Sequence, residues 1–332
     1  MSNLVQSNVT SRLVLETALA YEQDYDRISN QKYKLPYDMF ERTKQASPFF
    51  ALQQTGLFVR EAVATLARRN RGSEKDKKVW ISNEASPSLY PDYYRNAFHY
   101  QTDGWMSADS ANVYDTSTET LFLGRQDAMQ RIALAPLVQY SKELNRPLKV
   151  LEVACGTGRF MTFARDNLPL DSEYTALDLS PFYLDKAREN DSEWRSLRKR
   201  VDKENGNDVK DIQPVSIVQA QAENLPFQDE EFDAVVCIYL FHELPREIRA
   251  KAASEMSRVT KYGGRVILCD STQLGDRPVF DEVMGNFGNM NEPYYRDYIK
   301  DYLPRHFEKA GMQCLTKTVC SASKALEFKK GE

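Results

Sequence analysis

The chain has no run of 18 or more apolar residues, so its sequence predicts no membrane-spanning helix. An excess of either charge is also missing, because 48 acidic residues nearly balance 44 basic ones and leave a net charge of −4. This balance gives no general attraction to nucleic acid or to an anionic membrane. Residues 1–6 contain neither a basic nor an apolar segment, so we expect no secretory signal.

Cysteine and histidine are scarce. None of the five cysteines forms a C-x-x-C pair, so the sequence predicts no zinc site and no other metal. We expect the cysteines to be small buried side chains of a protein in the reducing cytoplasm. There are only three histidines, at positions 99, 242 and 306. Histidine titrates near neutral pH, so His242, which follows the predicted fourth strand, is a candidate base, while we expect His306 to start a helix.

The 332 residues suffice for about two domains. Helical patterns cover much of residues 1–70, and aromatic side chains crowd the segment that follows. The aromatic segment, residues 90–105, contains Tyr90, Tyr93, Tyr94, Phe98, His99, Tyr100 and Trp105. Such a cluster either packs the N-terminal helices onto the rest of the chain or forms the wall of a substrate pocket, and the sequence leaves both interpretations open.

The most informative stretch is a strand, a glycine turn and a helix start. Residues 148–153 are apolar and strand-forming, residues 154–158 are mostly small, and helical spacing begins at Arg159. Such a turn lets the backbone approach a nucleotide cofactor, and the free amides at the helix start point toward it. A dinucleotide fingerprint would need a third glycine where this chain has Met161, so that alternative fits poorly.

The turn resembles the first motif of class I S-adenosylmethionine (SAM) methyltransferases, an acidic residue followed by a small-x-Gly-x-Gly sequence. Three further matches follow in the same order. Residues 177–180 resemble the end of the second strand, and residues 219–227 resemble a segment of the type 11, ubiquinone-methyltransferase-like branch. The third match, residues 231–268, resembles the fourth strand, a helix, a Gly-Gly turn and the fifth strand. The resemblance covers residues 148–330.

This resemblance implies an α/β fold, with a Rossmann-like, seven-stranded, mainly parallel sheet and helices on both faces. We expect an N-terminal helical lid over residues 1–130. A SAM-binding domain would follow over residues 131–332, interrupted by an insertion at about 274–303. The cofactor would be SAM. The implied cofactor-binding residues are Glu152, Ala154, Gly156, Gly158, Asp178, Leu179, Gln221, Ala222, Glu223 and Cys237.

Two of these positions carry specific expectations. Asp178 lies twenty residues after Gly158, where an acidic residue of a Rossmann-type site holds the ribose hydroxyls. We also expect Gly156 and Gly158 to serve cofactor approach rather than folding. Gln221 stands where related enzymes often have Asp, and its amide can still accept a hydrogen bond from an adenine amino group.

The methyl acceptor should lie beside the cofactor, outside the carboxyl ends of the central strands. We expect catalytic contributions from His242, Tyr239, Tyr295 and Arg296. Arg296 would pair with an acceptor carboxylate or phosphate. The aromatic segment and residues 294–296 have no expected cofactor role, so we expect them to face each other across the acceptor.

We expect a small-molecule acceptor, no nucleic acid partner, and a monomer or homodimer. Two other functions stay open. One is methylation of a lipid-linked quinone, as in the relatives that the resemblance implies. The other is a catalytically silent SAM-fold protein that binds a partner.

Overall fold

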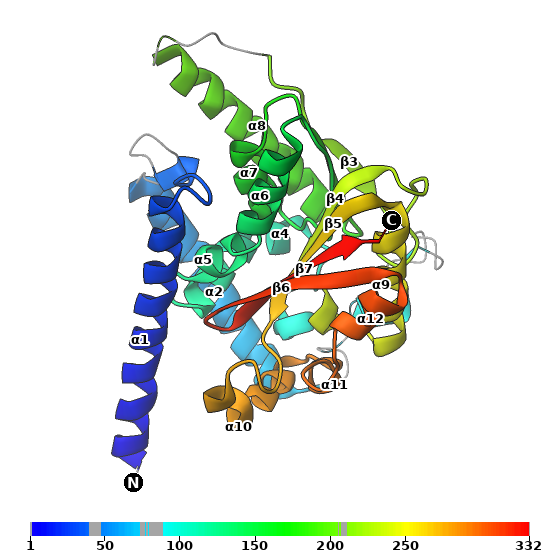
Figure 1. Cartoon of the computed structure of the whole chain (residues 1–332). Coiled ribbons are helices and arrows are strands. Elements are labelled where there is room, and N and C mark those ends of the chain that lie inside the picture. Colours follow the sequence, from blue (N-terminus) through cyan, green and yellow to red (C-terminus); the bar gives the residue numbers. More distant parts are fainter. Residues whose placement is uncertain are drawn as a thin grey trace.

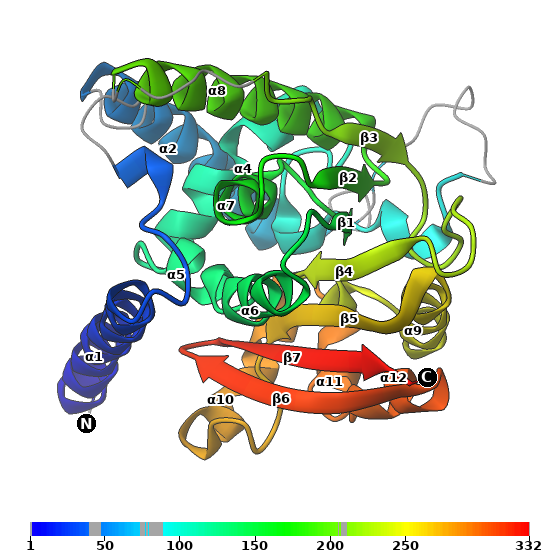
Figure 2. The same ribbon diagram turned by 45° about the horizontal axis from the view of Figure 1, so that its top comes forward.

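The computed structural model describes residues 2–39, 48–73, 77, 79, 89–204, 206 and 211–331. Parts of the expected polar segments at 70–78 and 199–213 lie outside these residues. Within the described residues, seven strands form one sheet in the order β3-β2-β1-β4-β5-β7-β6 (Figures 1 and 2). The strands are β1 Lys149–Val153, β2 Glu173–Asp178, β3 Ser216–Gln219, β4 Phe232–Ile238, β5 Thr260–Ser271, β6 Met312–Cys320 and β7 Ser323–Lys330.

The first five strands are parallel, and β7 runs antiparallel between β5 and β6. The expected seven-stranded, mainly parallel sheet is therefore confirmed. Every residue of β4 is buried, as a strand with both faces covered requires. A separate core covers each face of the sheet. Val150 of β1 packs into one core, and its neighbour Leu151 packs into the other.

Helices cover both faces of the sheet, as expected (Figure 2). One core contains side chains of α6 Leu134–Leu144, α7 Arg159–Asn167 and α8 Pro181–Glu204. The other contains side chains of α9 Arg246–Val259 and α12 Pro304–Lys309. The start of α8 is stabilised by a neighbouring side chain. The Ser180 hydroxyl accepts a hydrogen bond from the Tyr183 amide and so caps this helix.

One expectation about the sheet is corrected. We expected a Gly-Gly turn to separate α9 from the fifth strand, but β5 begins directly after the helix, at Thr260. Thr260 pairs with Phe232 and Arg265 with Ala234, so the glycine pair lies in a bulge within the strand. A side chain at Gly264 would lie 2.8 Å from the Asp233 carbonyl oxygen, which explains the glycine there.

The N-terminal region is helical. It contains α1 Ser2–Ser29, η1 Tyr37–Met39, α2 Pro48–Arg71, η3 Asp92–Arg95, η4 Phe98–Tyr100, α4 Ala108–Leu121 and α5 Gln126–Arg131. Asp24 of α1 forms a buried ion pair with Arg131 at 2.5 Å, which fastens this long helix beside α5 (Figure 1). Among the described residues, every helix is too short or too polar to traverse a bilayer.

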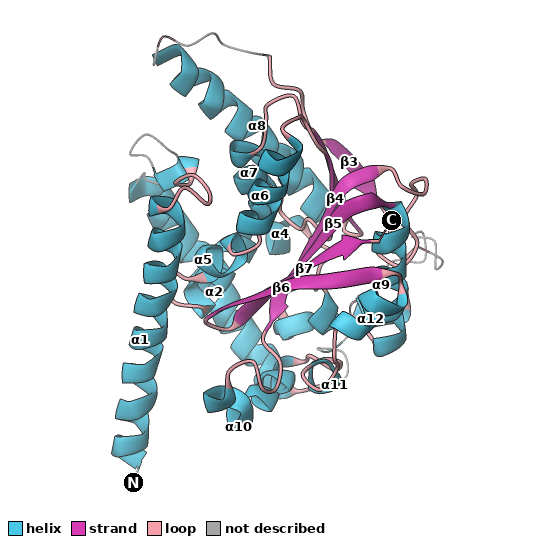
Figure 3. Ribbon diagram, viewed as in Figure 1, coloured by secondary structure: helices cyan, strands magenta, loops and turns pink. Residues whose placement is uncertain are grey.

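Between β5 and β6 the polypeptide forms a series of short helices. These are η6 Pro278–Phe280, α10 Asp281–Met284, η7 Gly285–Met290 and α11 Tyr295–Tyr298 (Figure 3). The segment meets the N-terminal region at η4, where the Asn291 side chain donates a hydrogen bond to the Ala97 carbonyl at 2.9 Å. The two parts of the chain without an expected cofactor role therefore contact each other.

Candidate active site

The turn after β1 is held open by three residues in the left-handed backbone region. Their φ angles are 58° at Ala154, 54° at Gly156 and 76° at Gly158. The Cys155 amide donates to the Leu177 carbonyl at 2.9 Å, so the turn is tied to the end of β2. Ala154 occupies this region without the freedom of glycine, and such strain is found at functional sites.

Asp178 stands at the carboxyl end of β2, against this turn. The Gly156 amide donates to its Oδ2 at 2.9 Å, and the Ser180 amide donates to its Oδ1 at 2.8 Å. Burial raises the pKa of Asp178, and the backbone donors act in the opposite direction. The carboxylate is therefore fixed in place at the wall of a cavity.

This first cavity is largely aromatic. Its wall contains Tyr93, Tyr94, Trp105, Tyr114, Ala154, Gly156, Leu177, Asp178, Leu179, Tyr183, Ala220, Gln221, Ala222, Ile238, Tyr239, Leu240, Glu243 and Leu244. The rings of Trp105, Tyr114 and Tyr183 meet edge to face, with centroids 5.5 to 5.6 Å apart. Flat apolar walls beside the Asp178 carboxylate suit a nucleoside, and aromatic faces also attract a cation.

Six of the expected cofactor residues line this cavity: Ala154, Gly156, Asp178, Leu179, Gln221 and Ala222. The Gln221 side chain donates to the Leu89 carbonyl at 2.8 Å, which ties it to the N-terminal region. Glu152 lies instead at a second cavity behind the turn. There the Tyr174 hydroxyl donates to Glu152 at 2.8 Å, and burial raises the pKa of Glu152 to about 8.

Three expected cofactor residues do not line either cavity. A Cβ at Gly158 would approach Met161 to 2.8 Å and Ala187 to 3.1 Å, so this glycine serves helix packing. Glu223 accepts a hydrogen bond from the Tyr93 hydroxyl at 2.6 Å. Cys237 is fully buried in one of the two cores.

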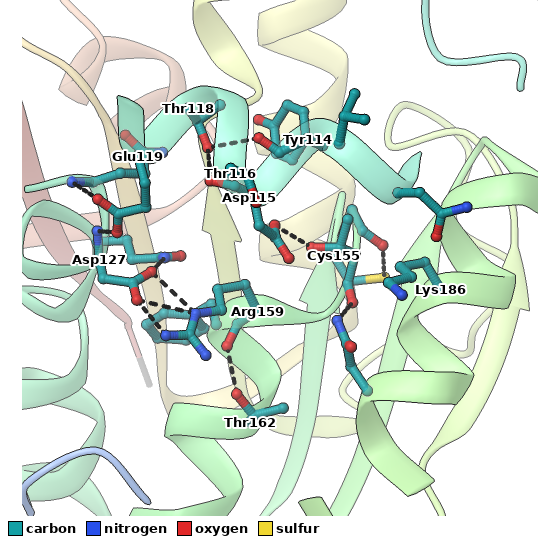
Figure 4. A pocket seen from close by; sticks show the side chains of 18 of the residues that line it. Tyr114, Asp115, Thr116, Thr118, Glu119, Asp127, Cys155, Arg159, Thr162 and Lys186 are labelled. Atoms are coloured by element: carbon teal, nitrogen blue, oxygen red, sulfur yellow. Dashed lines mark hydrogen bonds and ion pairs between the residues drawn. The ribbon is translucent and has the colours of Figure 1, made fainter. Parts of the chain in front are cut away.

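The second cavity has a volume of about 590 Å³ and is mostly polar. It adjoins the first, since both are lined by Tyr114, Ala154, Gly156, Ile238 and Tyr239. Figure 4 shows its carboxylates converging from α4 and α5 on the turn and on the start of α7.

The polar groups of this second cavity are paired with one another. The Thr157 hydroxyl donates to Asp115 at 2.7 Å, and Asp127 pairs with Arg159 (Figure 4). Glu119 accepts from the Asp127 amide at 2.8 Å. Burial raises the pKa of Asp115, and it raises the pKa of Glu119 to about 7. Sequence analysis missed these groups, because the residue pattern of α4 does not distinguish it from the other polar helices.

Beyond the carboxyl ends of β4 and β5, His242 forms a buried pair with Asp270. Nδ1 of His242 lies 2.7 Å from Oδ1 of Asp270. The Ser271 amide donates to the same oxygen, and the Phe241 amide donates to Oδ2, each at 2.7 Å. Burial lowers the pKa of His242, but the Asp270 carboxylate outweighs it, and the pKa rises to about 9. The Tyr295 ring stands edge-on to the imidazole at 6.3 Å.

The other two expected catalytic residues differ in position. Tyr239 lines both cavities, and its hydroxyl bonds to the Ser323 hydroxyl at 2.8 Å. Arg296 is exposed, lines neither cavity and donates to the Asn289 side chain at 2.6 Å. In α11, Tyr295 and Tyr298 share the buried face, so Arg296 points outward. The structure therefore does not bring Arg296 to either cavity, and of the four expected catalytic residues only Tyr239 lines one.

The aromatic segment reaches both sites. Its Tyr93, Tyr94 and Trp105 line the first cavity, beside six of the residues expected to bind the cofactor. Its His99 lies beside the insertion, where the ring packs edge-on against Phe287 at 5.4 Å.

Comparisons with known proteins agree with this geometry. Residues 151–268 match a family model described as a methyltransferase domain, of type 11. The chain is 30% identical over 175 residues to a demethylmenaquinone methyltransferase of Thermobifida fusca, covering 53% of this chain and 63% of that protein. It is 28% identical over 173 residues to a ubiquinone/menaquinone biosynthesis C-methyltransferase of Rhizobium etli, covering 52% and 59%. The matches thus span about three fifths of these relatives.

Among solved structures, an O-methyltransferase family protein from Burkholderia thailandensis superposes with a TM-score of 0.52. The superposition covers 83% of this chain and 72% of that one, and at 14% identity it shows the fold alone. The expected acidic turn, the strand order and the matched domain agree with one another. The matched domain, the relatives and the strand order together support a class I SAM methyltransferase of the type 11 branch over the matched residues.

Proposed function

We propose that this protein transfers a methyl group from SAM to a small-molecule acceptor. The observation that carries the proposal is the pair of adjoining cavities around the turn, one aromatic with a fixed carboxylate and one polar. SAM has matching parts, a flat adenosine and a polar amino acid, joined by a sulfonium. When bound, SAM supplies an electrophilic methyl group, so the protein mainly has to position the acceptor.

The residues present fit this cofactor. A Cβ added at Gly156 would meet only Tyr183, at 3.9 Å, so the turn leaves open space above its backbone. Asp178 would hold the ribose hydroxyls, with Leu179, Gln221 and Ala222 beside the adenine. Glu152 and the polar second cavity would hold the amino acid part. The aromatic rings that face the cavity suit the positive sulfonium.

On the acceptor side, we assign Tyr239, His242 and Tyr295 to the wall of the substrate site. The N-terminal region, residues 1–130, and the insertion at 274–303 would enclose it and exclude water. Asn291 supports this arrangement, because it bridges the two segments. We do not extend the assignment to Arg296, which is exposed and paired elsewhere.

The test is calorimetric titration with SAM. Asp178→Asn keeps the size of the side chain but replaces the charged acceptor of the ribose hydroxyls, so SAM affinity should fall about tenfold or more. Asp185→Asn, on the exposed part of α8, is the matched control and should bind as wild type does. Unchanged affinity in a folded Asp178→Asn protein would reject the assignment.

The names of the relatives favour a demethylated quinone as one acceptor class. Turnover of SAM should therefore be measured with a short-chain demethylmenaquinone analogue and with a panel of hydroxylated aromatic metabolites. Methylation of the quinone carbon would support the quinone assignment. SAM binding without turnover of any acceptor in a metabolite extract would instead support a silent binding protein.

A further inference from the structure

Four ionisable side chains gather beside the first cavity from three distant parts of the chain. His99 comes from η4, His242 and Glu243 follow β4, and Glu292 lies in the insertion. One atom each of His99, His242 and Glu243 lies within 4.8 Å of the others, a spacing that can hold a metal ion. Oε1 of Glu292 lies 3.3 Å from Nε2 of His99, so this carboxylate adjoins the group.

Two members of this group have buried polar atoms without a hydrogen bond among the described residues. They are Nδ1 of His99 and both carboxylate oxygens of Glu292. Glu292 is only 1% exposed. Burying a polar group without a partner costs about 1–3 kcal/mol, and more for a charged one, so a bound cation would stabilise the carboxylate in this position.

His242 is oriented as a metal-ligating histidine would be. Its Nδ1 bonds to Asp270, which is itself held by two backbone amides. The other nitrogen, Nε2, faces the cluster, 3.8 Å from Oε1 of Glu243. A carboxylate behind the imidazole fixes the tautomer and raises the basicity of the ligating nitrogen in many metal sites.

We propose that His99, His242 and Glu243 bind one divalent transition-metal ion, with Glu292 as a further ligand. Two imidazoles with carboxylates favour Zn²⁺, Fe²⁺, Co²⁺ or Mn²⁺ over Mg²⁺ and Ca²⁺, which prefer oxygen ligands alone. The sequence-based expectation of no metal considered cysteine pairs. It had no means to join ligands that lie so far apart in the chain.

The position of the ion narrows the acceptor class, and this step rests on the proposed function. Glu243 lines the first cavity, so the ion would stand between the cofactor site and the acceptor. There it would select an acceptor that offers an oxygen ligand, such as a phenol, and would favour loss of its proton. A purely aliphatic acceptor without such an oxygen would gain nothing from this site.

The experiment uses the full chain, purified without a histidine tag and treated with a chelator. Titration with Co²⁺ should produce the visible absorption of a nitrogen-ligated ion and saturate at one ion per chain. Zn²⁺ should displace it, and Zn²⁺ should raise the melting temperature.

Two variants test the ligands. His99→Asn is chosen because Asn tolerates the left-handed backbone at position 99, where φ is 55°. Glu292→Gln keeps the size of the side chain. Each should weaken Co²⁺ binding at least tenfold. The control is His306→Asn, because His306 bonds to Asp301 on α12, outside the cluster.

The proposal is overturned if the wild-type protein binds no Co²⁺ stoichiometrically, or if both folded variants bind it as tightly as wild type. SAM titration of the chelator-treated protein separates this result from the proposed function. Loss of metal binding with intact SAM affinity removes only the metal site. Intact metal binding without SAM affinity removes only the proposed function.

Discussion

At the scale of single residues, Gly156 and Gly158 of the turn have different structural roles. Both have positive φ, so an added side chain strains the backbone at either position. Around Gly156 the added Cβ would meet open space toward Tyr183. Around Gly158 it would meet Met161 and the backbone of Ala187 at 2.8 to 3.2 Å. One glycine therefore lets a ligand approach the backbone, and the other lets α8 approach α7.

We predict that Gly158→Ala lowers the free energy of unfolding more than Gly156→Ala does. Because the two substitutions share the backbone cost, the difference isolates helix packing and should be about 1–3 kcal/mol. Gly156→Ala should instead weaken SAM binding. Urea unfolding and calorimetry on both variants check this. Equal stability of the two variants would contradict the packing role of Gly158.

At the scale of elements, α11 shows how one short helix divides residues that are adjacent in sequence. Tyr295 and Tyr298 are buried and approach the His242 ring to 6.3 and 6.1 Å. Arg296 stands on the outer side, packed on Gly288 and bonded to Asn289. The two buried tyrosines and the exposed arginine therefore lie on different sides of α11, and only the tyrosines contact the proposed acceptor site.

We predict that Tyr295→Ala lowers SAM turnover at least tenfold with the acceptor found by screening, because it removes a wall next to His242. Arg296→Ala should change turnover less than twofold, since its side chain lies in solvent. Initial rates at saturating SAM measure both effects, and melting temperatures control for folding. A large loss of activity in Arg296→Ala would contradict this prediction and would indicate that Arg296 contributes to the acceptor site.

At the scale of the whole molecule, stability and the cofactor site are coupled through Glu152. This carboxyl is buried under the turn and bonds to Tyr174. Burial raises its pKa from 4.5 to about 8. The folded protein therefore keeps a proton that the unfolded chain loses, and this group destabilises the fold progressively as the pH rises from 4.5 to 8.

We predict that Glu152→Gln removes this pH dependence. Its stability relative to wild type should increase between pH 5 and pH 8, by up to about 1.4 kcal/mol for each pH unit, and then level off. Urea unfolding at several pH values measures the difference. Glu173→Gln, an exposed change on β2, is the control. Parallel stability curves for wild type and Glu152→Gln would contradict the raised pKa.

The sequence by itself determined the local parts of this protein. The apolar run before the turn, the glycines and the spacing to Asp178 predicted a strand, a cofactor turn and a carboxylate, and the structure places Asp178 at that turn. The closing hairpin was also predictable, because alternating side chains specify strands and their faces. Each of these features depends on neighbours within a few residues or on a fixed repeat.

Only the tertiary structure decided which distant side chains meet. In the folded chain the aromatic segment lines the first cavity, and Arg296 lies on the surface. His99, His242 and Glu292, from three regions of the chain, lie close together. Such contacts depend on how long connections close and on which helix face packs inward, and a single sequence records neither directly. The burial that pairs Glu152 with Tyr174, or leaves Glu292 without a hydrogen bond from any described residue, exists only in the packed molecule.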